Sequence, residues 1–270
     1  MKFAKVDNIK SEPKKGLTGV CLFCGSPVIA KCGQKNIHHW SHKGKLECDY
    51  WWENETEWHR KWKDYFPENW QEIIQYSDHG EKHIADIMTD EGWVIEFQNS
   101  FLSSEERQSR NDFYKKLIWV FNGEKYRSDS KKIEASFNKV DSTGDIFRIR
   151  LWGNNFLNKY ILKNSLPFFD MGDSSLYLIL PKFSSHFVYI KKCSKEEFIK
   201  IFINESNKES LKFEKNLEHW LALAKELDSK IEEDWRRKAD LMHEQFRIKN
   251  RRVKSTGLRE SFMNFIDMPK

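Results

Sequence analysis

Residues 82–98, KHIADIMTDEGWVIEFQ, decide the fold of this chain, because two strands and the turn between them can be read from their pattern. In Lys82–Thr89, β-branched and other apolar residues alternate around Asp86, which predicts a strand. Trp93–Gln98 alternates in the same way and predicts the next strand. Asp90–Gly92 carries the Asp and Gly typical of a hairpin turn. We therefore expect an antiparallel hairpin.

Counting from this turn places Thr89 opposite Trp93, and Asp86 opposite Glu96. Side chains of cross-strand neighbours lie roughly 5 Å apart. Burying a carboxylate among apolar residues is costly unless a partner or a cation compensates. A divalent Mg or Mn ion prefers such hard oxygen ligands. Gln98 shares the face of Glu96 and could orient a water or a phosphate oxygen.

A metal held by two carboxylates suits phosphodiester hydrolysis, because it polarises the phosphoryl group and lowers the pKa of its bound water. Glu57, on the preceding predicted helix, could add a carboxylate to a second metal. His83 could donate a proton or contact DNA. The alternative is a solvated face on which Lys82 or Lys116 neutralises the two acids.

The segments around the hairpin predict a compact α/β unit over residues 51–128. Apolar residues recur at three- and four-residue steps over 51–66, which predicts a helix that Pro67 ends. Residues 72–76 predict a strand, 103–116 a polar helix and 117–121 a buried strand. The predicted order is helix, three strands, helix, strand.

Ordered motifs span this unit: Glu55-x-Glu57-Trp58-His59-x-x-Trp62-Lys63, HIADI at 83–87, VIEFQNS at 94–100, Arg110-x-x-Phe113-Tyr114 and LIWVF at 117–121. Over about residues 20–125 they resemble the competence protein CoiA-like family of the PD-(D/E)xK nuclease superfamily. The resemblance implies an αβββαβ restriction-endonuclease-like core. It also implies metal binding by Asp86 and Glu96, with Gln98 in the place of the superfamily's lysine, and a link to DNA uptake, recombination or defence.

Four of the five cysteines fall within residues 1–50, which favours a metal-binding module over disulfides. Cys21-x2-Cys24 precedes His39-x2-His42, and two thiolates with two imidazoles suit tetrahedral zinc. A segment this poor in aliphatic residues needs such a staple to fold. The family resemblance includes a similar His-aromatic-x-His. The alternative ligands are His38, Cys32 and Cys48.

The rest of the chain predicts an accessory α+β region over 129–205 and a long amphipathic helix with a basic tail over 206–270. The helix could pack on the body of the protein or pair with a second copy as a homo-oligomer. The net charge of +5 permits nucleic-acid binding. Candidate contacts are Lys43, Lys45, Arg110, Arg251 and Arg252.

These observations predict a zinc-containing, Mg/Mn-dependent DNA nuclease, a hydrolase of bacterial or phage DNA. No apolar run is long enough to span a bilayer and the first residues lack a secretory h-region, so we expect a cytoplasmic protein without a membrane partner. The alternatives are a non-catalytic zinc-containing nucleic-acid-binding protein and a nuclease that acts on RNA.

Overall fold

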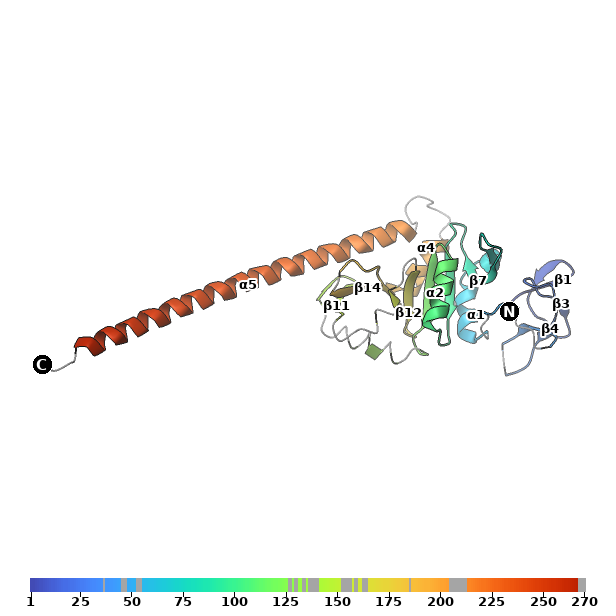
Figure 1. Cartoon of the computed structure of the whole chain (residues 1–270). Coiled ribbons are helices and arrows are strands. Elements are labelled where there is room, and N and C mark those ends of the chain that lie inside the picture. Colours follow the sequence, from blue (N-terminus) through green and yellow to red (C-terminus); the bar gives the residue numbers. More distant parts are fainter. Residues whose placement is uncertain are drawn as a thin grey trace. The chain divides into compact units, whose positions relative to one another are not determined.

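The computed structural model describes most of the 270 residues in a mixed α+β fold with two sheets (Figure 1). The described residues are 1–35, 37–44, 48–51, 55–125, 128, 131–132, 135, 141–151, 157, 160–161, 165–184, 186–203 and 213–266, with the side chains of 141–143 and of residues beyond 248 outside the description. Two compact units divide them, Met1–Leu221 and Ala222–Lys270.

The first sheet occupies the N-terminal segment, where the sequence shows little periodicity. In the described residues it has five strands in the order β2-β1-β3-β4-β5. These are β1 (Ala4–Val6), β2 (Ile9–Ser11), β3 (Thr18–Val20), β4 (Pro27–Lys31) and β5 (His39–His42). A small core of Phe23, Val28 and Trp40 lies beneath them and contacts Ile74 and Ile84 of the larger sheet.

The second sheet contains, among the described residues, nine strands in the order β10-β11-β14-β13-β12-β9-β8-β7-β6. Their bounds are β6 (Gln71–Tyr76), β7 (Lys82–Met88), β8 (Val94–Gln98), β9 (Leu117–Asn122), β10 (Asp141–Thr143), β11 (Ile146–Arg150), β12 (Ser165–Asp170), β13 (Ser175–Ile179) and β14 (Phe187–Ser194). The helices are α1 (Glu57–Asp64), the 3-10 turn η1 (Glu68–Trp70), α2 (Ser104–Phe113), α4 (Lys195–Ile203) and α5 (Phe213–Ile266). The chain therefore follows the predicted order from α1 to β9.

The predicted hairpin is present with the predicted register. β7 and β8 pair antiparallel with Ile87 opposite Ile95 and Met88 opposite Val94. The Thr89 amide donates to the Trp93 carbonyl at 2.9 Å, and Gly92 closes the turn with a φ of +78° that favours glycine. Continuing this register places Asp86 opposite Glu96.

Helix α2 connects β8 to β9, and these two strands pair in parallel. The Ser103 hydroxyl accepts from the Glu106 amide at 3.0 Å, as expected of an N-cap. Trp119 lies beside Glu96 in this register. All residues of β8 and β9 are buried, so the polar side chains of β8 are held in the interior.

Residues 165–170 form β12, which the sequence did not predict as a strand. β12 pairs in parallel with β9 and antiparallel with β13. Pro167 lies in its interior, and proline is uncommon in a central strand because it cannot donate to the ladder. The strands of residues 141–194 thus continue the sheet that carries the hairpin.

Helix α5 runs from Phe213 to Ile266, within the region 206–270 that was predicted to contain a long helix and a basic tail, and the basic residues belong to the helix. Its apolar spacing continues well into the second unit. Within the described residues, no helix combines the length and hydrophobicity that crossing a membrane requires.

Candidate metal centres

A cavity of about 60 Å³ lies beside the hairpin, with space for several water-sized ligands. Acidic and basic side chains from the nine-stranded sheet, from α1 and α2, and from the segment that precedes α1 face it. Its polar lining consists of Asp49, Glu55, His59, Lys63, Glu72, Asp86, Glu96, Gln98 and Arg110. The cavity therefore brings together Asp86, Glu96 and Gln98, as predicted, with several groups that the sequence did not single out.

Asp86 sits in the middle strand of an acidic row. Glu72 of β6 lies opposite it on one side, between the paired positions of that ladder, and Glu96 of β8 lies opposite on the other. One oxygen of Asp86, Oδ2, accepts from the Phe97 amide at 3.0 Å. The Asp86 carboxylate thus accepts the hydrogen bond of a backbone amide next to the place where the β7–β8 ladder ends.

Glu96 is buried, and its two oxygens differ in their surroundings. Oε2 lies 3.6 Å from the Arg110 guanidinium. Among the described residues, Oε1 has no hydrogen-bond partner, although it is fully shielded. Burial and the negative charge of Asp86 raise the pKa of Glu96 to about 8, and the positive charge of Arg110 offsets only part of this. A bare buried carboxylate oxygen beside a second carboxylate fits a cation.

Lys63 supplies a fixed positive charge to this acidic group. It projects from α1, and its Nζ lies 3.2 Å from both Glu55 and Glu72 and 3.3 Å from Asp86. Burial alone would lower the pKa of Lys63, but these three carboxylates hold it well above its usual range. The lysine therefore stays protonated inside the cavity. One sequence signal indicates that Lys63 is buried: it lies next to Trp62, on the apolar face of the predicted helix.

Gln98 lines the cavity from the end of β8 and is 2% exposed. Its Nε2 donates to the Ser100 carbonyl at 3.1 Å. His59, one turn before Lys63 on α1, also lines the cavity and contacts the Phe97 carbonyl through Nε2. The amide and the imidazole are thus both anchored to backbone at the edge of the acidic row.

Glu57 does not reach the cavity, and Glu55 takes the place predicted for it. The helix begins at Glu57, because the Thr56 side chain caps it by accepting from the His59 amide at 3.2 Å. Glu57 is two residues from the inward-facing His59, so it lies on the exposed side of the helix. Glu55 precedes the cap, and its side chain is only 4% exposed.

His83 is also outside the cavity, since it lies three residues from Asp86 on β7 and so faces the other side of the sheet. Its Nδ1 lies 2.9 Å from Asp49 and its Nε2 lies 3.0 Å from Glu81. The ring stacks on Trp51 at 3.3 Å between centroids. These buried contacts orient Asp49, which lines the cavity. They leave neither ring nitrogen of His83 accessible to DNA.

The predicted basic contacts have different surroundings. Arg110 is 5% exposed and donates to the Trp51 carbonyl at 2.9 Å, so it braces Glu96 and is not a surface contact. Lys43 is exposed. Lys45 and the side chains of Arg251 and Arg252 lie outside the described residues.

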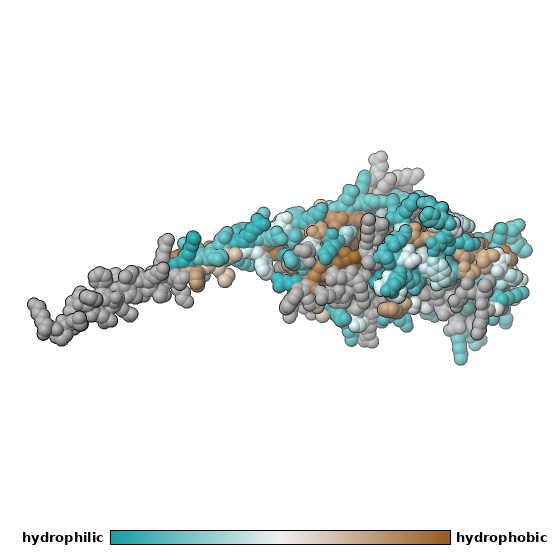
Figure 2. All heavy atoms as spheres, in the orientation of Figure 1, coloured by the Kyte–Doolittle hydropathy of each residue, from teal (hydrophilic) through white to brown (hydrophobic). Residues whose placement is uncertain are grey.

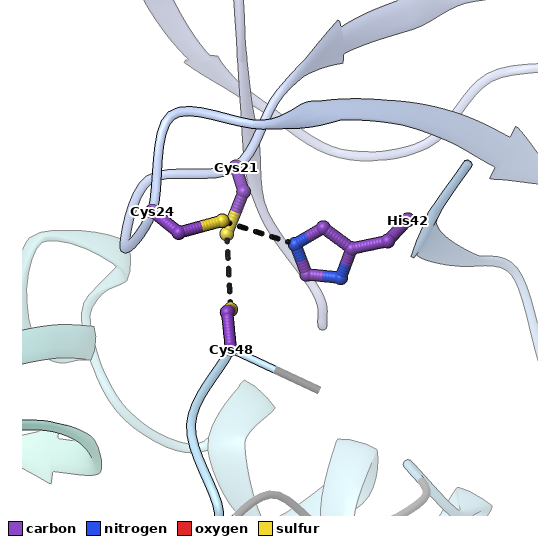
Figure 3. A group of neighbouring side chains, drawn as sticks. All are labelled: Cys21, Cys24, His42 and Cys48. Atoms are coloured by element: carbon purple, nitrogen blue, oxygen red, sulfur yellow. Dashed lines mark hydrogen bonds between the residues drawn. The ribbon is translucent and has the colours of Figure 1, made fainter. Parts of the chain in front are cut away.

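A second group of ligand atoms lies in the N-terminal module (Figure 3). The side chains of Cys21, Cys24, His42 and Cys48 converge, with one ligand atom from each within 4.8 Å of the others. The Cys21 and Cys48 sulfurs lie 3.8 Å apart, and Cys24 Sγ lies 3.3 Å from His42 Nε2. Tetrahedral zinc with Zn–S bonds of about 2.3 Å places two sulfurs about 3.8 Å apart. This Cys3His group could therefore bind zinc.

The fourth member of this group is Cys48, whereas the primary prediction was His39. Strand β5 extends from His39 to His42, so residues three apart on it face opposite sides of the sheet. The Nδ1 of His39 lies 3.0 Å from the Ile37 carbonyl instead. Cys21 and Cys24 lie in the turn before β4, where Gly25 has a φ of +73° and donates to the Cys21 carbonyl at 3.0 Å.

Comparisons with known proteins match the same module. Residues 5–50 match the family model described as competence protein CoiA, N-terminal domain. The matched segment contains the four residues of the Cys3His group and Asp49 of the cavity, while Asp86 and Glu96 lie outside it. Among curated proteins, no match was found. The predicted family resemblance is thereby confirmed through the N-terminal module.

Proposed function

We propose that this chain, which belongs to the competence protein CoiA-like family, is a divalent-metal-dependent nuclease that hydrolyses the phosphodiester bonds of DNA. The single observation that carries the proposal is the bare buried Oε1 of Glu96, next to Asp86 in a cavity among the described residues. A buried carboxylate oxygen without a donor is costly. A Mg or Mn ion between the two acids would displace the proton that Glu96 otherwise retains and would compensate the buried charge.

The donor set fits such an ion. Asp86 and Glu96 offer hard carboxylate oxygens, and the cavity leaves room for the waters that Mg retains. The single positive charge of Lys63 is shared by three acids, Glu55, Glu72 and Asp86. It therefore offsets only part of the negative charge around the cavity. When bound, the ion would polarise the scissile phosphate and lower the pKa of a water.

The chain's own residues would complete the site. Lys63 takes the role of the lysine that the PD-(D/E)xK pattern places at position 98 here. Its ammonium comes from α1, lies 3.3 Å from Asp86 and can balance charge that develops on the phosphate. Gln98, held by its bond to the Ser100 carbonyl, can position a water or a phosphate oxygen.

The test is cleavage of duplex DNA, single-stranded DNA and RNA with Mg or Mn by the full chain. We expect wild type to cut DNA, and Asp86→Asn to lose at least about a hundredfold in rate, since metal-site carboxylates contribute several kcal/mol to transition-state stabilisation. Glu57→Gln is the matched control because Glu57 is an exposed acid on the same helix as Lys63. It should cut like wild type.

Two outcomes would contradict this assignment. Binding of DNA without cleavage under either metal would favour a non-catalytic nucleic-acid-binding protein that uses the zinc module. Cleavage that Asp86→Asn leaves unchanged would place the chemistry elsewhere. Cleavage of RNA but not of DNA would retain the site and change the substrate.

A further inference from the structure

An apolar stripe runs along helix α5 in the second unit. Ile231, Trp235, Ala239, Met242 and Phe246 fall within an arc of about 80° at the α-helical rotation of about 100° per residue. Trp235, Met242 and Phe246 are 60%, 70% and 63% exposed. Figure 2 shows hydrophobic side chains on this helix among hydrophilic ones. Several large exposed side chains on one face mark an interaction surface.

The stripe is nearly straight, which suits a long contact. Trp235 and Phe246 are eleven residues apart, as are Ile231 and Met242. An eleven-residue repeat advances about 3.67 residues per turn, close to the 3.6 of a straight helix. A partner helix can therefore follow the stripe over several turns.

Charged residues are segregated along the helix, with an acidic block near one end of the stripe and a basic block near the other. Residues 226–234 contain five acids and one lysine, a net charge of −4. Residues 247–254 contain five basic residues and no acid. Two parallel copies would align like blocks and repel, whereas two antiparallel copies would align the acidic block of each with the basic block of the other.

The stripe and the charges share one centre of symmetry, between Asp240 and Leu241. Trp235 and Phe246 are equally distant from it, and so are Ala239 and Met242. Two opposite-charge pairs are arranged about the same midpoint on matching flanks of the stripe, Glu232 with Arg247 on one flank and Asp234 with Lys249 on the other. The two residues of each pair lie within two residues of the same level in this register. The apolar and charged patterns thus agree on one antiparallel register.

We propose that the α5 segment of about residues 226–254 pairs antiparallel with the same segment of a second copy of this chain, with the two-fold axis between Asp240 and Leu241. A symmetric self-contact of this kind is isologous, so each copy presents the same stripe and both charge blocks. Trp235 of one copy lies at the level of Phe246 of the other, and Met242 at the level of Ala239.

The test is sedimentation of the full chain over concentrations from about 0.1 to 100 μM, a range chosen to bracket micromolar affinity. Wild type should dimerise. Met242→Asp should weaken the dimer at least tenfold, because it places a carboxylate on the stripe. Leu241→Asp is the matched control. It makes the same kind of change one residue away, about 100° off Met242, on another exposed position.

Charge exchange tests the register. Glu232→Arg alone and Arg247→Asp alone should each weaken the dimer, since Glu232 and Arg247 lie on the same flank of the stripe and each change creates two like-charged contacts per dimer. The double variant should return to within about threefold of wild type, an interaction energy that only paired sites produce. Circular dichroism confirms that each variant keeps its helix.

The proposal fails if wild type stays monomeric at the highest concentration, if Leu241→Asp weakens the dimer as much as Met242→Asp, or if the double charge variant is weaker than either single one. A monomer in which Arg247→Asp lowers affinity for duplex DNA would also overturn it, and would make the basic block a nucleic-acid contact.

Discussion

Glu96→Gln should stabilise the metal-free chain at alkaline pH while it removes the nuclease activity that we propose. The amide keeps the size of the side chain and carries no charge. In wild type, burial and Asp86 raise the pKa of Glu96 from 4.5 to about 8. Active-site carboxylates held in this way cost stability, which the variant recovers.

The magnitude follows from proton linkage. The native state retains the Glu96 proton over the window from pH 4.5 to about 8, where the unfolded state has lost it. Because the folded pKa is the higher one, this contribution to stability is complete below pH 4.5 and is lost as the pH rises through 8. Between pH 6 and pH 8, wild type should lose about 2 kcal/mol of unfolding free energy relative to Glu96→Gln.

Urea unfolding at pH 6 and pH 8, followed by tryptophan fluorescence, measures this difference. The eleven tryptophans, including Trp119 beside Glu96 in the sheet, make this signal a measure of global unfolding. The buffer should contain no added divalent metal and no chelator, so that metal in the Cys3His group is undisturbed. Added Mn at 100 times its Kd should then stabilise wild type by about 2.7 kcal/mol and leave the variant unchanged.

Equal pH dependence in wild type and Glu96→Gln would refute this reasoning, because it would mean that Glu96 titrates near its ordinary pKa. A variant that Mn stabilises as strongly as wild type would refute the assignment of Glu96 as a ligand. Glu57→Gln, an exposed acid, should show the wild-type response in both measurements.

Three further predictions follow from the described contacts. Cys48→Ser should lower the zinc content measured by mass spectrometry, while Cys32→Ser and His39→Ala should retain it; loss only in His39→Ala would restore the sequence-based ligand set. Lys63→Met should cost about 3–5 kcal/mol in urea unfolding, because it strands three carboxylates, and a cost under about 1 kcal/mol would contradict their coupling. Asp170→Ala should cost about 3 kcal/mol by the same assay, because its buried carboxylate accepts from two indole N–H groups and pairs with a lysine; a neutral result would deny that it joins α1 to the sheet.

Structural features that depend on a few neighbouring residues were predicted correctly. The turn at 90–92 determined the register of β7 and β8, because a hairpin's pairing follows from where it turns. The start of the polar helix was predicted at residue 103, and the Ser103 hydroxyl caps α2 there by accepting from the Glu106 amide at 3.0 Å. Each of these features depends on fewer than ten neighbouring residues, so the sequence alone was sufficient.

Features that depend on tertiary packing were predicted poorly. The spacing of Trp residues extended the first helix back to residue 51, whereas the Thr56 cap starts it at Glu57, and this shift exchanged Glu57 for Glu55 in the site. Lys63 was missed because only the folded sheet brings Glu55, Glu72 and Asp86 around it.

Short and interrupted strands also carried little signal. The strands of the N-terminal sheet have three to five residues, too few to establish a period of two, and the conformation of β5 is what separates His39 from His42. Strand β12 is long enough, but it was not predicted because Pro167 lies in its interior and proline is uncommon in a central strand. The predicted domain boundaries, the nucleic-acid partner and the cytoplasmic location remain predictions.

A Mn-soaked crystal, examined by anomalous diffraction, tests the central claim most directly. The two acids on β7 and β8 should hold a Mn ion between them, within about 2.0–2.3 Å of one oxygen of Asp86 and of Oε1 of Glu96. Lys63 should remain beside Asp86. A cavity without an anomalous peak at saturating Mn, or a peak bound only by other residues, would contradict the account.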